Sequence, residues 1–254
     1  MLLTIFFNPV ELRFVEAPEN DIYIVLDVMR ATTTLAVMFD QGARRVLAAQ
    51  TLEQAREAAQ KVPDHLLCGE RHTKTPPGFD YNNSPAQFAQ IDLSGRDLIL
   101  TTSNGTRALF ACPEQSTRLA GSFYNAQAVV SYALALALAQ ERDCNISMVC
   151  AGEYGYFSLE DTVCAGHLAF ELLCQHPKCE VRDSVHAAIA LYESYPAPRL
   201  LEYAQSAHDL MASGQEHDLE FCMRKNASDS VPTVVGVEAE TGLLLLNEKY
   251  RSNG

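Results

Sequence analysis

Short apolar segments that alternate with helix-compatible stretches constrain the fold of this chain more than any other feature. Such segments lie at 22–26, 46–49, 66–68, 98–100, 119–120 and 146–150, and small or polar residues follow each one. The apolar N-terminal residues 1–7 suit a first strand. Continuous apolar strands are typical of a parallel sheet that helices cover on both faces. The sequence therefore predicts an α/β chain, a three-layer α/β/α fold with a mixed, mainly parallel sheet.

The C-terminal part has a different pattern. Helix-compatible sequence occupies about 184–223, and apolar segments at 231–237 and 243–246 flank a turn at 238–242. This pattern predicts an antiparallel C-terminal β-hairpin, which we expect at the edge of the sheet. Because no Gly/Ser linker interrupts the sequence, we expect residues 1–254 to form a single α/β domain, and a C-terminal subdomain from about 180 is left open.

Charge and hydrophobicity exclude several classes of protein. The chain carries 19 Lys and Arg against 32 Asp and Glu, a net charge of -13, without a basic cluster for a nucleic acid. The apolar run at 129–139 is too short to span a membrane, and residues 1–7 lack the basic flank of a signal peptide. Eight cysteines without C-x-x-C spacing indicate reduced, buried thiols. We therefore expect a cytoplasmic protein with no nucleic-acid or membrane partner.

Polar clusters follow five of the predicted strands. They lie at 27–30, 69–70, 101–107, 121–125 and 152–153. In open α/β sheets, ligands bind beyond the carboxyl ends of the strands, so we expect these clusters to meet at one edge. An acidic chain that binds a small anion there needs a few placed cations or a divalent metal.

Two clusters have the chemistry of an anion site. Asp27 could hold Mg²⁺, and Arg30 could pair with a phosphate or carboxylate; alternatively, they are a helix cap and a solvated arginine. The 101–107 cluster combines hydroxyl groups, a glycine and a helix start, which favour an anion, although a capped turn would also explain it. Its candidate binding residues are Thr102, Asn104, Gly105, Thr106 and Arg107.

Two further segments offer candidates. The irregular segment 69–85 could fold over a ligand, with Lys74 as an anion contact and Asn83 and Ser84 as donors; alternatively, it is a solvent loop before a helix. Glu160 and Asp161 at a helix start are metal ligands or simply favour the positive end of the helix dipole.

Common catalytic schemes are absent from the sequence. It lacks G-x-S-x-G, G-x-x-x-x-G-K-[ST], G-x-G-x-x-G and H-E-x-x-H, and neither an aspartyl-phosphate D-x-D nor a Cys-x5-Arg loop is present. The scheme that remains is a metal bound by carboxylates, with arginine and backbone N–H donors around a small anion.

Six segments together carry a family resemblance. They are DVMRATTT (27–34), GE (69–70), PGFDYNNSP (77–85), TTSNGTRAL (101–109), GSFYNA (121–126) and CAGEYGYFSLEDTVCAG (150–166), and DLEFC near Asp218 extends the match. In order and spacing they resemble the 2-phosphosulfolactate phosphatase family, Mg²⁺-dependent phosphomonoester hydrolases associated with coenzyme M biosynthesis. Asn82 stands where the family usually has glycine, and Asn226 replaces an acidic residue.

The resemblance implies removal of phosphate from the 2-hydroxyl of a small sulfonated or carboxylated acid. We expect Mg²⁺ on Asp27 and one or more of Glu70, Glu160 and Asp161. Arg30, Arg107 and the helix start at 104–106 would hold the phosphate and the second acidic group, while water attacks in line. Asn125 is a further expected substrate contact.

Other functions stay open at this point. The same edge could capture a small anion without turnover, and a thiol or metal sensor is a weaker reading of the cysteines. The sequence leaves a homo-oligomer open.

Overall fold

The computed structural model describes residues 1–254 except 17, 19, 141–143 and 249–254. The strands are β1 Leu2–Phe6, β2 Ile22–Leu26, β3 Arg45–Ala48, β4 Leu66–Gly69, β5 Asp97–Thr101, β6 Thr117–Gly121, β7 Ile146–Cys150, β8 Glu180–Val181, β9 Pro232–Val237 and β10 Leu244–Glu248. The helices are α1 Ala31–Asp40, α2 Leu52–Lys61, α3 Pro85–Phe88, α4 Gly105–Ala111, α5 Ala126–Leu138, α6 Leu159–Gln175, α7 Asp183–Ser194, α8 Ala197–Tyr203, α9 Gln205–Ala212 and α10 Glu216–Met223, with short 3₁₀ helices η1 Pro9–Phe14 and η2 Phe123–Asn125.

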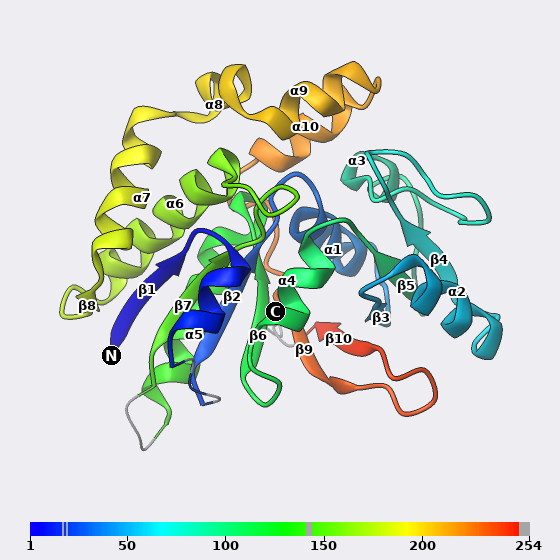
Figure 1. Ribbon diagram of the computed structural model, residues 1–254, viewed down its shortest axis with the longest axis horizontal. Coiled ribbons are helices and arrows are strands. Elements are labelled where there is room, and N and C mark those ends of the chain that lie inside the picture. The colour runs from blue at the N-terminus through cyan, green and yellow to red at the C-terminus, as the bar shows by residue number, and fades with distance from the viewer. Residues whose placement is uncertain (17, 19, 141–143, 249–254) are drawn as a thin grey trace.

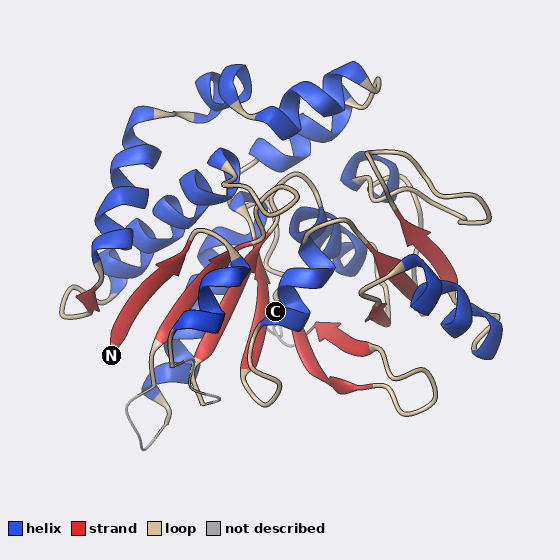
Figure 2. Cartoon of the chain, viewed as in Figure 1, coloured by secondary structure: helices blue, strands red, loops and turns tan. Residues whose placement is uncertain are grey.

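The described strands form one ten-stranded sheet in the order β4-β5-β3-β10-β9-β6-β2-β7-β1-β8. Neighbouring strands are parallel except where β9 and β10 take part. The mixed, mainly parallel sheet predicted from the apolar segments is therefore confirmed (Figure 2).

The predicted position of the hairpin is wrong. β9 and β10 lie in the middle of the sheet, because β9 pairs antiparallel with β6 and β10 pairs antiparallel with β3. No direct pairing joins β6 to β3, so the C-terminal hairpin bridges two parallel halves. Its strands bury residues such as Val234, Leu244 and Leu246, which suits a central position.

Alternate residues of β2 show that helices cover both faces of the sheet. Ile22, Ile24 and Leu26 pack in a core with α5 and α6, whereas Tyr23 and Val25 pack in a second core with α1 and α4. This two-sided burial confirms the three-layer α/β/α fold.

The register of the parallel strands brings their carboxyl ends to one edge. Leu26 pairs with Gly121 and with Cys150, and Gly69 pairs with Thr101. α8, α9 and α10 cross beyond this edge, at the top of Figure 1. The loops after β2, β4, β5 and β7 therefore face a helical layer that the C-terminal part supplies.

The cysteines and the helix lengths bear on two further predictions. Among the described residues all eight cysteines are free, and only Cys174 is exposed. Nowhere in the described chain is a helix both long enough and apolar enough to cross a bilayer.

Candidate active site

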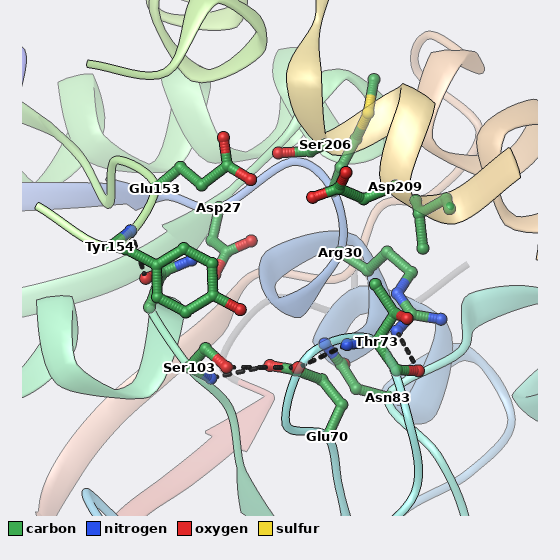
Figure 3. Close-up of a pocket in the computed structure, with 13 residues that line it drawn as sticks. Asp27, Arg30, Glu70, Thr73, Asn83, Ser103, Glu153, Tyr154, Ser206 and Asp209 are labelled. Atoms are coloured by element: carbon green, nitrogen blue, oxygen red, sulfur yellow. Dashed lines mark hydrogen bonds between the residues drawn. The ribbon is translucent and has the colours of Figure 1, made fainter. Parts of the chain in front are cut away.

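A small cavity lies at the carboxyl edge of the sheet. Its volume is about 50 Å³. Its lining comes from the ends of β2, β4, β5 and β7, from the 70–83 segment and from α9, and consists of Asp27, Met29, Arg30, Glu70, Thr73, Asn83, Ser103, Asn104, Glu153, Tyr154, Ser206, Asp209 and Leu210. Four of the five predicted polar clusters therefore contribute to one pocket (Figure 3).

Asp27 lies at the end of β2 in a crowded, buried position. Its Oδ1 accepts a hydrogen bond of 3.3 Å from the Ala31 N–H. Burial raises the pKa of Asp27 to about 7; the charges of Glu70 and Glu160 add to the rise, and backbone N–H groups of Ala31 and Gly105 oppose it. The helix start of α4 comes so close that a Cβ on Gly105 would lie 2.6 Å from Asp27 Oδ2. Only glycine leaves room for this carboxylate.

Glu70 is held by the two loops beside it. Its Oε1 accepts from the Ser103 N–H at 2.7 Å, and its Oε2 accepts from Ser103 Oγ and the Thr73 N–H, both at 3.2 Å. These bonds fix the carboxylate at the pocket wall (Figure 3).

Arg30 is buried, not solvated, with 3% of its surface exposed. Its Nη1 donates to Asp218 Oδ2 at 2.6 Å and also to Gln215 Oε1. Asp218 in turn accepts from Ser84 Oγ at 2.6 Å. α10 and the residue before it therefore orient the guanidinium that reaches the pocket.

Asn83 and Asn104, two of the predicted binding residues, also line the pocket. Asn83 is 2% exposed, and its Oδ1 has no hydrogen-bond partner among the described residues. Asn104 Oδ1 accepts from the Tyr154 N–H at 3.1 Å. Asn83 thus presents an unused acceptor, whereas Asn104 ties two loops together.

Among the predicted residues that stay outside the lining, four hold local structure or face solvent. Thr102 and Thr106 donate their N–H groups to each other's Oγ1 at 3.1 Å and so brace the start of α4. Ser84 caps α3 by accepting from the Gln87 N–H, the alternative considered above. Lys74 is exposed.

Asn125, predicted as a substrate contact, lies outside the pocket lining. It is fully buried, and its Nδ2 donates to Ala120 O at 3.1 Å and Ser230 O at 2.9 Å, while its Oδ1 accepts from the Ser122 N–H. Its side-chain amide forms hydrogen bonds that close the turn at η2 and hold the segment before β9. Asn125 therefore does not line the pocket.

The predicted acids on α6 lie behind the pocket wall. Asp161 accepts from the Val28 N–H at 2.9 Å and from the Gly152 N–H at 3.1 Å, and both of its oxygens therefore hold loops. Burial raises the pKa of Asp161, and Glu160 and Asp27 raise it further. Glu160 is buried without lining the cavity. In the described part of the chain, no three or more His, Cys, Asp or Glu side chains group as a metal site.

α9 supplies pocket residues that the sequence did not reveal. Ser206, Asp209 and Leu210 of α9 line the cavity. Figure 3 shows Ser206 and Asp209 on the side of the cavity opposite Glu70 and Ser103. Asp209 faces Glu153: burial raises the pKa of Glu153 to about 7, with further contributions from the charges of Glu160 and Asp209 and from a hydrogen bond with Asp209. No local motif marked these helical residues, since only the packing of α9 brings them to the site.

Arg107 lies in an adjoining hollow. This second cavity has a volume of about 510 Å³ and shares Ser103, Asn104 and Tyr154 with the small pocket. Arg107 is exposed there, beside Arg13 of η1.

The chain matches one family model and several known proteins. The family model described as 2-phosphosulpholactate phosphatase matches residues 9–236. A relative from Thermotoga maritima is 35% identical over 227 residues, covering 89% of this chain and 92% of its own. One from Carboxydothermus hydrogenoformans is 33% identical over 232 residues (91% and 92%), and one from Deinococcus radiodurans is 34% identical over 227 residues (88% and 92%). All three carry the name "Probable 2-phosphosulfolactate phosphatase".

Proposed function

The chain belongs to the 2-phosphosulfolactate phosphatase family, and we propose that it is a Mg²⁺-assisted phosphomonoester hydrolase acting on a small 2-phospho acid. The names of its relatives support the reaction, and 2-phosphosulfolactate is the substrate they suggest. The pocket chemistry supports the need for a cation.

The charge of the pocket carries this proposal. Four acidic side chains, Asp27, Glu70, Glu153 and Asp209, line a cavity of about 50 Å³ together with the guanidinium of Arg30. Arg30 is already paired with Asp218. A phospho acid with several negative charges would be repelled by such a pocket unless a divalent cation offset the acids.

The donor set fits Mg²⁺. This ion commonly takes one or two protein carboxylates and keeps water and substrate phosphate as its other ligands. Asp27 and Glu70 line the cavity, and the unpartnered Asn83 Oδ1 is a neutral oxygen beside them. Glu160 and Asp161 do not line the cavity, so the metal ligands we propose narrow to Asp27 and Glu70. Bound there, the ion would polarise a phosphoryl oxygen and offset the charge that develops during transfer.

The other residues divide the remaining tasks. Arg30, held by Asp218, would bind the phosphoryl oxygens as a charge-assisted donor, and Ser103 Oγ would position them. Water held by the cation would attack the phosphorus in line. Glu153 would give its proton to the leaving oxygen, because a pKa of about 7 suits a general acid at neutral pH.

A phosphate-release screen over 2-phospho acids, with Mg²⁺ and with excess chelator, tests this function. We expect release that requires Mg²⁺. Ligand-dependent thermal stabilisation without any phosphate release would instead identify a small-anion-binding protein.

A further inference from the structure

Two tight turns, 71–74 and 153–156, lie at the small pocket, which Thr73, Glu153 and Tyr154 help to line. In each turn the first and last residues exchange two backbone hydrogen bonds, and the two central residues have positive φ. This is the pattern of a type I′ turn, whose central positions usually hold glycine, asparagine or aspartate. The two turns therefore have the same backbone form but unusual residues at their tips.

His72 and Tyr154 take the first central position of their turns, at φ of 52° and 50°. Positive φ is unfavourable for a residue with a bulky side chain. The two rings stack with their centroids 5.6 Å apart, and the Tyr154 hydroxyl oxygen lies 3.1 Å from His72 Nδ1. These contacts join the tips of the two turns and give a reason for ring residues at both positions.

The hydroxyl group of Tyr154 belongs to the side of the pocket where Glu70 is held. Figure 3 shows it pointing into the cavity on the side of Ser103 and Glu70. The Tyr154 N–H donates to Asn104 Oδ1 at 3.1 Å, which fixes the turn beside the start of α4. Burial raises the pKa of Tyr154, while a hydrogen bond with Ser103 lowers it and the charge of Glu70 raises it. With its pKa raised overall, the hydroxyl keeps its proton at neutral pH.

The hydroxyl of Tyr154 has one proton to donate, while its oxygen can also accept a hydrogen bond. If His72 donates from Nδ1 to this oxygen, the O–H of Tyr154 is left for a group inside the pocket. A phosphoryl group there needs such donors, because four acidic side chains line the cavity and Arg30 is already paired with Asp218. The pair of turns can therefore supply a neutral donor to an anion in an acidic pocket.

We infer that Tyr154 is a further catalytic residue, whose hydroxyl donates a hydrogen bond to a phosphoryl oxygen, and that His72 is a positioning residue, which donates from Nδ1 to the Tyr154 oxygen. The inference rests on the proposed function, which places a phosphoryl group in this pocket. A hydrogen bond to a charged oxygen contributes about tenfold to 100-fold in affinity or rate. Because the contact is to the phosphoryl group, its loss should also weaken the binding of inorganic phosphate.

Removal of a single hydroxyl group tests Tyr154. In Tyr154→Phe we expect kcat/KM for 2-phosphosulfolactate and the calorimetric affinity for inorganic phosphate, both measured with Mg²⁺, to fall about tenfold or more. Tyr156→Phe is the matched control and should change neither quantity, since Tyr156 belongs to the same turn, is 78% exposed and does not line the pocket.

The two measurements separate the contact from the reaction. A phosphate affinity that falls in Tyr154→Phe but not in Tyr156→Phe supports the contact even if none of the proteins hydrolyses a phosphomonoester, in which case the proposed function alone fails. If wild type turns over and Tyr154→Phe keeps both the phosphate affinity and kcat/KM, the inference is overturned.

Substitutions at His72 test the positioning role. His72→Leu removes the donor, whereas His72→Asn keeps one, because the amide nitrogen of asparagine can take the place of Nδ1. We expect kcat/KM to fall about threefold in His72→Leu and to stay near the wild-type value in His72→Asn. In a Tyr154→Phe background, His72→Leu should cause no further loss, as for a residue that acts through the hydroxyl. Equal losses in His72→Leu and His72→Asn, or an added loss in the double variant, would exclude this role for His72.

Discussion

Arg30 and Asp218 form a buried ion pair, 2.6 Å between Nη1 and Oδ2, that joins the loop after β2 to α10. Each side chain is 2% exposed. The pair connects the parallel sheet to the C-terminal helices at the point where the pocket forms, and it orients the guanidinium proposed to bind phosphate.

Replacing Asp218 by alanine should therefore weaken both folding and catalysis. Removing one partner of a buried ion pair leaves the other charge uncompensated and costs about 3–5 kcal/mol of unfolding free energy. Urea denaturation measures this loss, and kcat/KM should fall as well. Ser84→Ala removes one hydrogen bond to Asp218 and also the cap of α3, and should cost about 2 kcal/mol. Equal losses of unfolding free energy in Asp218→Ala and Ser84→Ala would show that the ion pair contributes no more than the hydrogen bonds of Ser84.

Gly105→Ala should displace Asp27. The new Cβ would lie 2.6 Å from Asp27 Oδ2, and such overpacking costs about 1–3 kcal/mol. Gly121→Ala is the matched control, since its Cβ would lie 2.6 Å from Ile24 Cγ2 in the core, away from the cavity. Thermal unfolding should show both variants destabilised, but only Gly105→Ala should lose activity per folded molecule. Retained activity there would show that the position of Asp27 is not critical.

Glu153→Gln tests the proposed proton donor. If protonated Glu153 is required, wild-type kcat falls as the pH rises through about 7, the pKa to which burial and the nearby acids raise this group. The variant should lose this limb of the profile, and kcat should drop by about 100-fold at pH 6. Asp209→Asn removes a neighbouring charge and should move the limb to lower pH. An unchanged pH profile in Glu153→Gln excludes the role.

His167 makes stability depend on pH. Burial, and next the charge of Lys225, lower its pKa from 6.5 to about 4, and neither ring nitrogen has a hydrogen-bond partner among the described residues. Between these values the unfolded chain binds more protons, so the contribution of neutral His167 is complete above pH 6.5 and is lost as the pH falls towards 4. The loss is on the order of 3 kcal/mol.

His167→Phe should flatten that slope. The ring packs with Phe123 and Tyr192, which suits an aromatic replacement. Urea denaturation at pH 7 and pH 5 measures the slope, with His186→Phe at an exposed position as the control. The same slope in His167→Phe and wild type would assign the pH dependence to other groups.

The sequence predicts where the strands end because each strand is a continuous apolar segment. The parallel arrangement then brings the carboxyl ends of the strands to one edge of the sheet. These two features place Asp27, Glu70 and Asn104 at a common edge of the sheet, and all three line the pocket. It could not locate Asp209, because a helical residue reaches the pocket only through the packing of α9.

Other differences arise from competition between local and tertiary contacts. Asn125 follows a strand end as predicted, but its spacing from Ser122 also suits a capping box, and that local structure takes its amide. The hairpin at 232–248 has ordinary antiparallel sequence, and nothing local shows that it bridges β3 and β6. Its central position depends on the space between β3 and β6, which exists only once the whole sheet has formed.

The central claim is that a cation held at Asp27 makes an acidic pocket competent for phosphate transfer. Phosphate release from 2-phosphosulfolactate by wild type and Asp27→Asn, each with Mg²⁺ and with excess chelator, tests it most directly. We predict wild-type release that chelator abolishes and added Mg²⁺ restores. The variant should remain folded and release phosphate at least about 100-fold more slowly, as expected for losing several kcal/mol of metal-derived stabilisation. Chelator-resistant wild-type turnover, or full Mg²⁺-dependent activity in Asp27→Asn, would contradict the account.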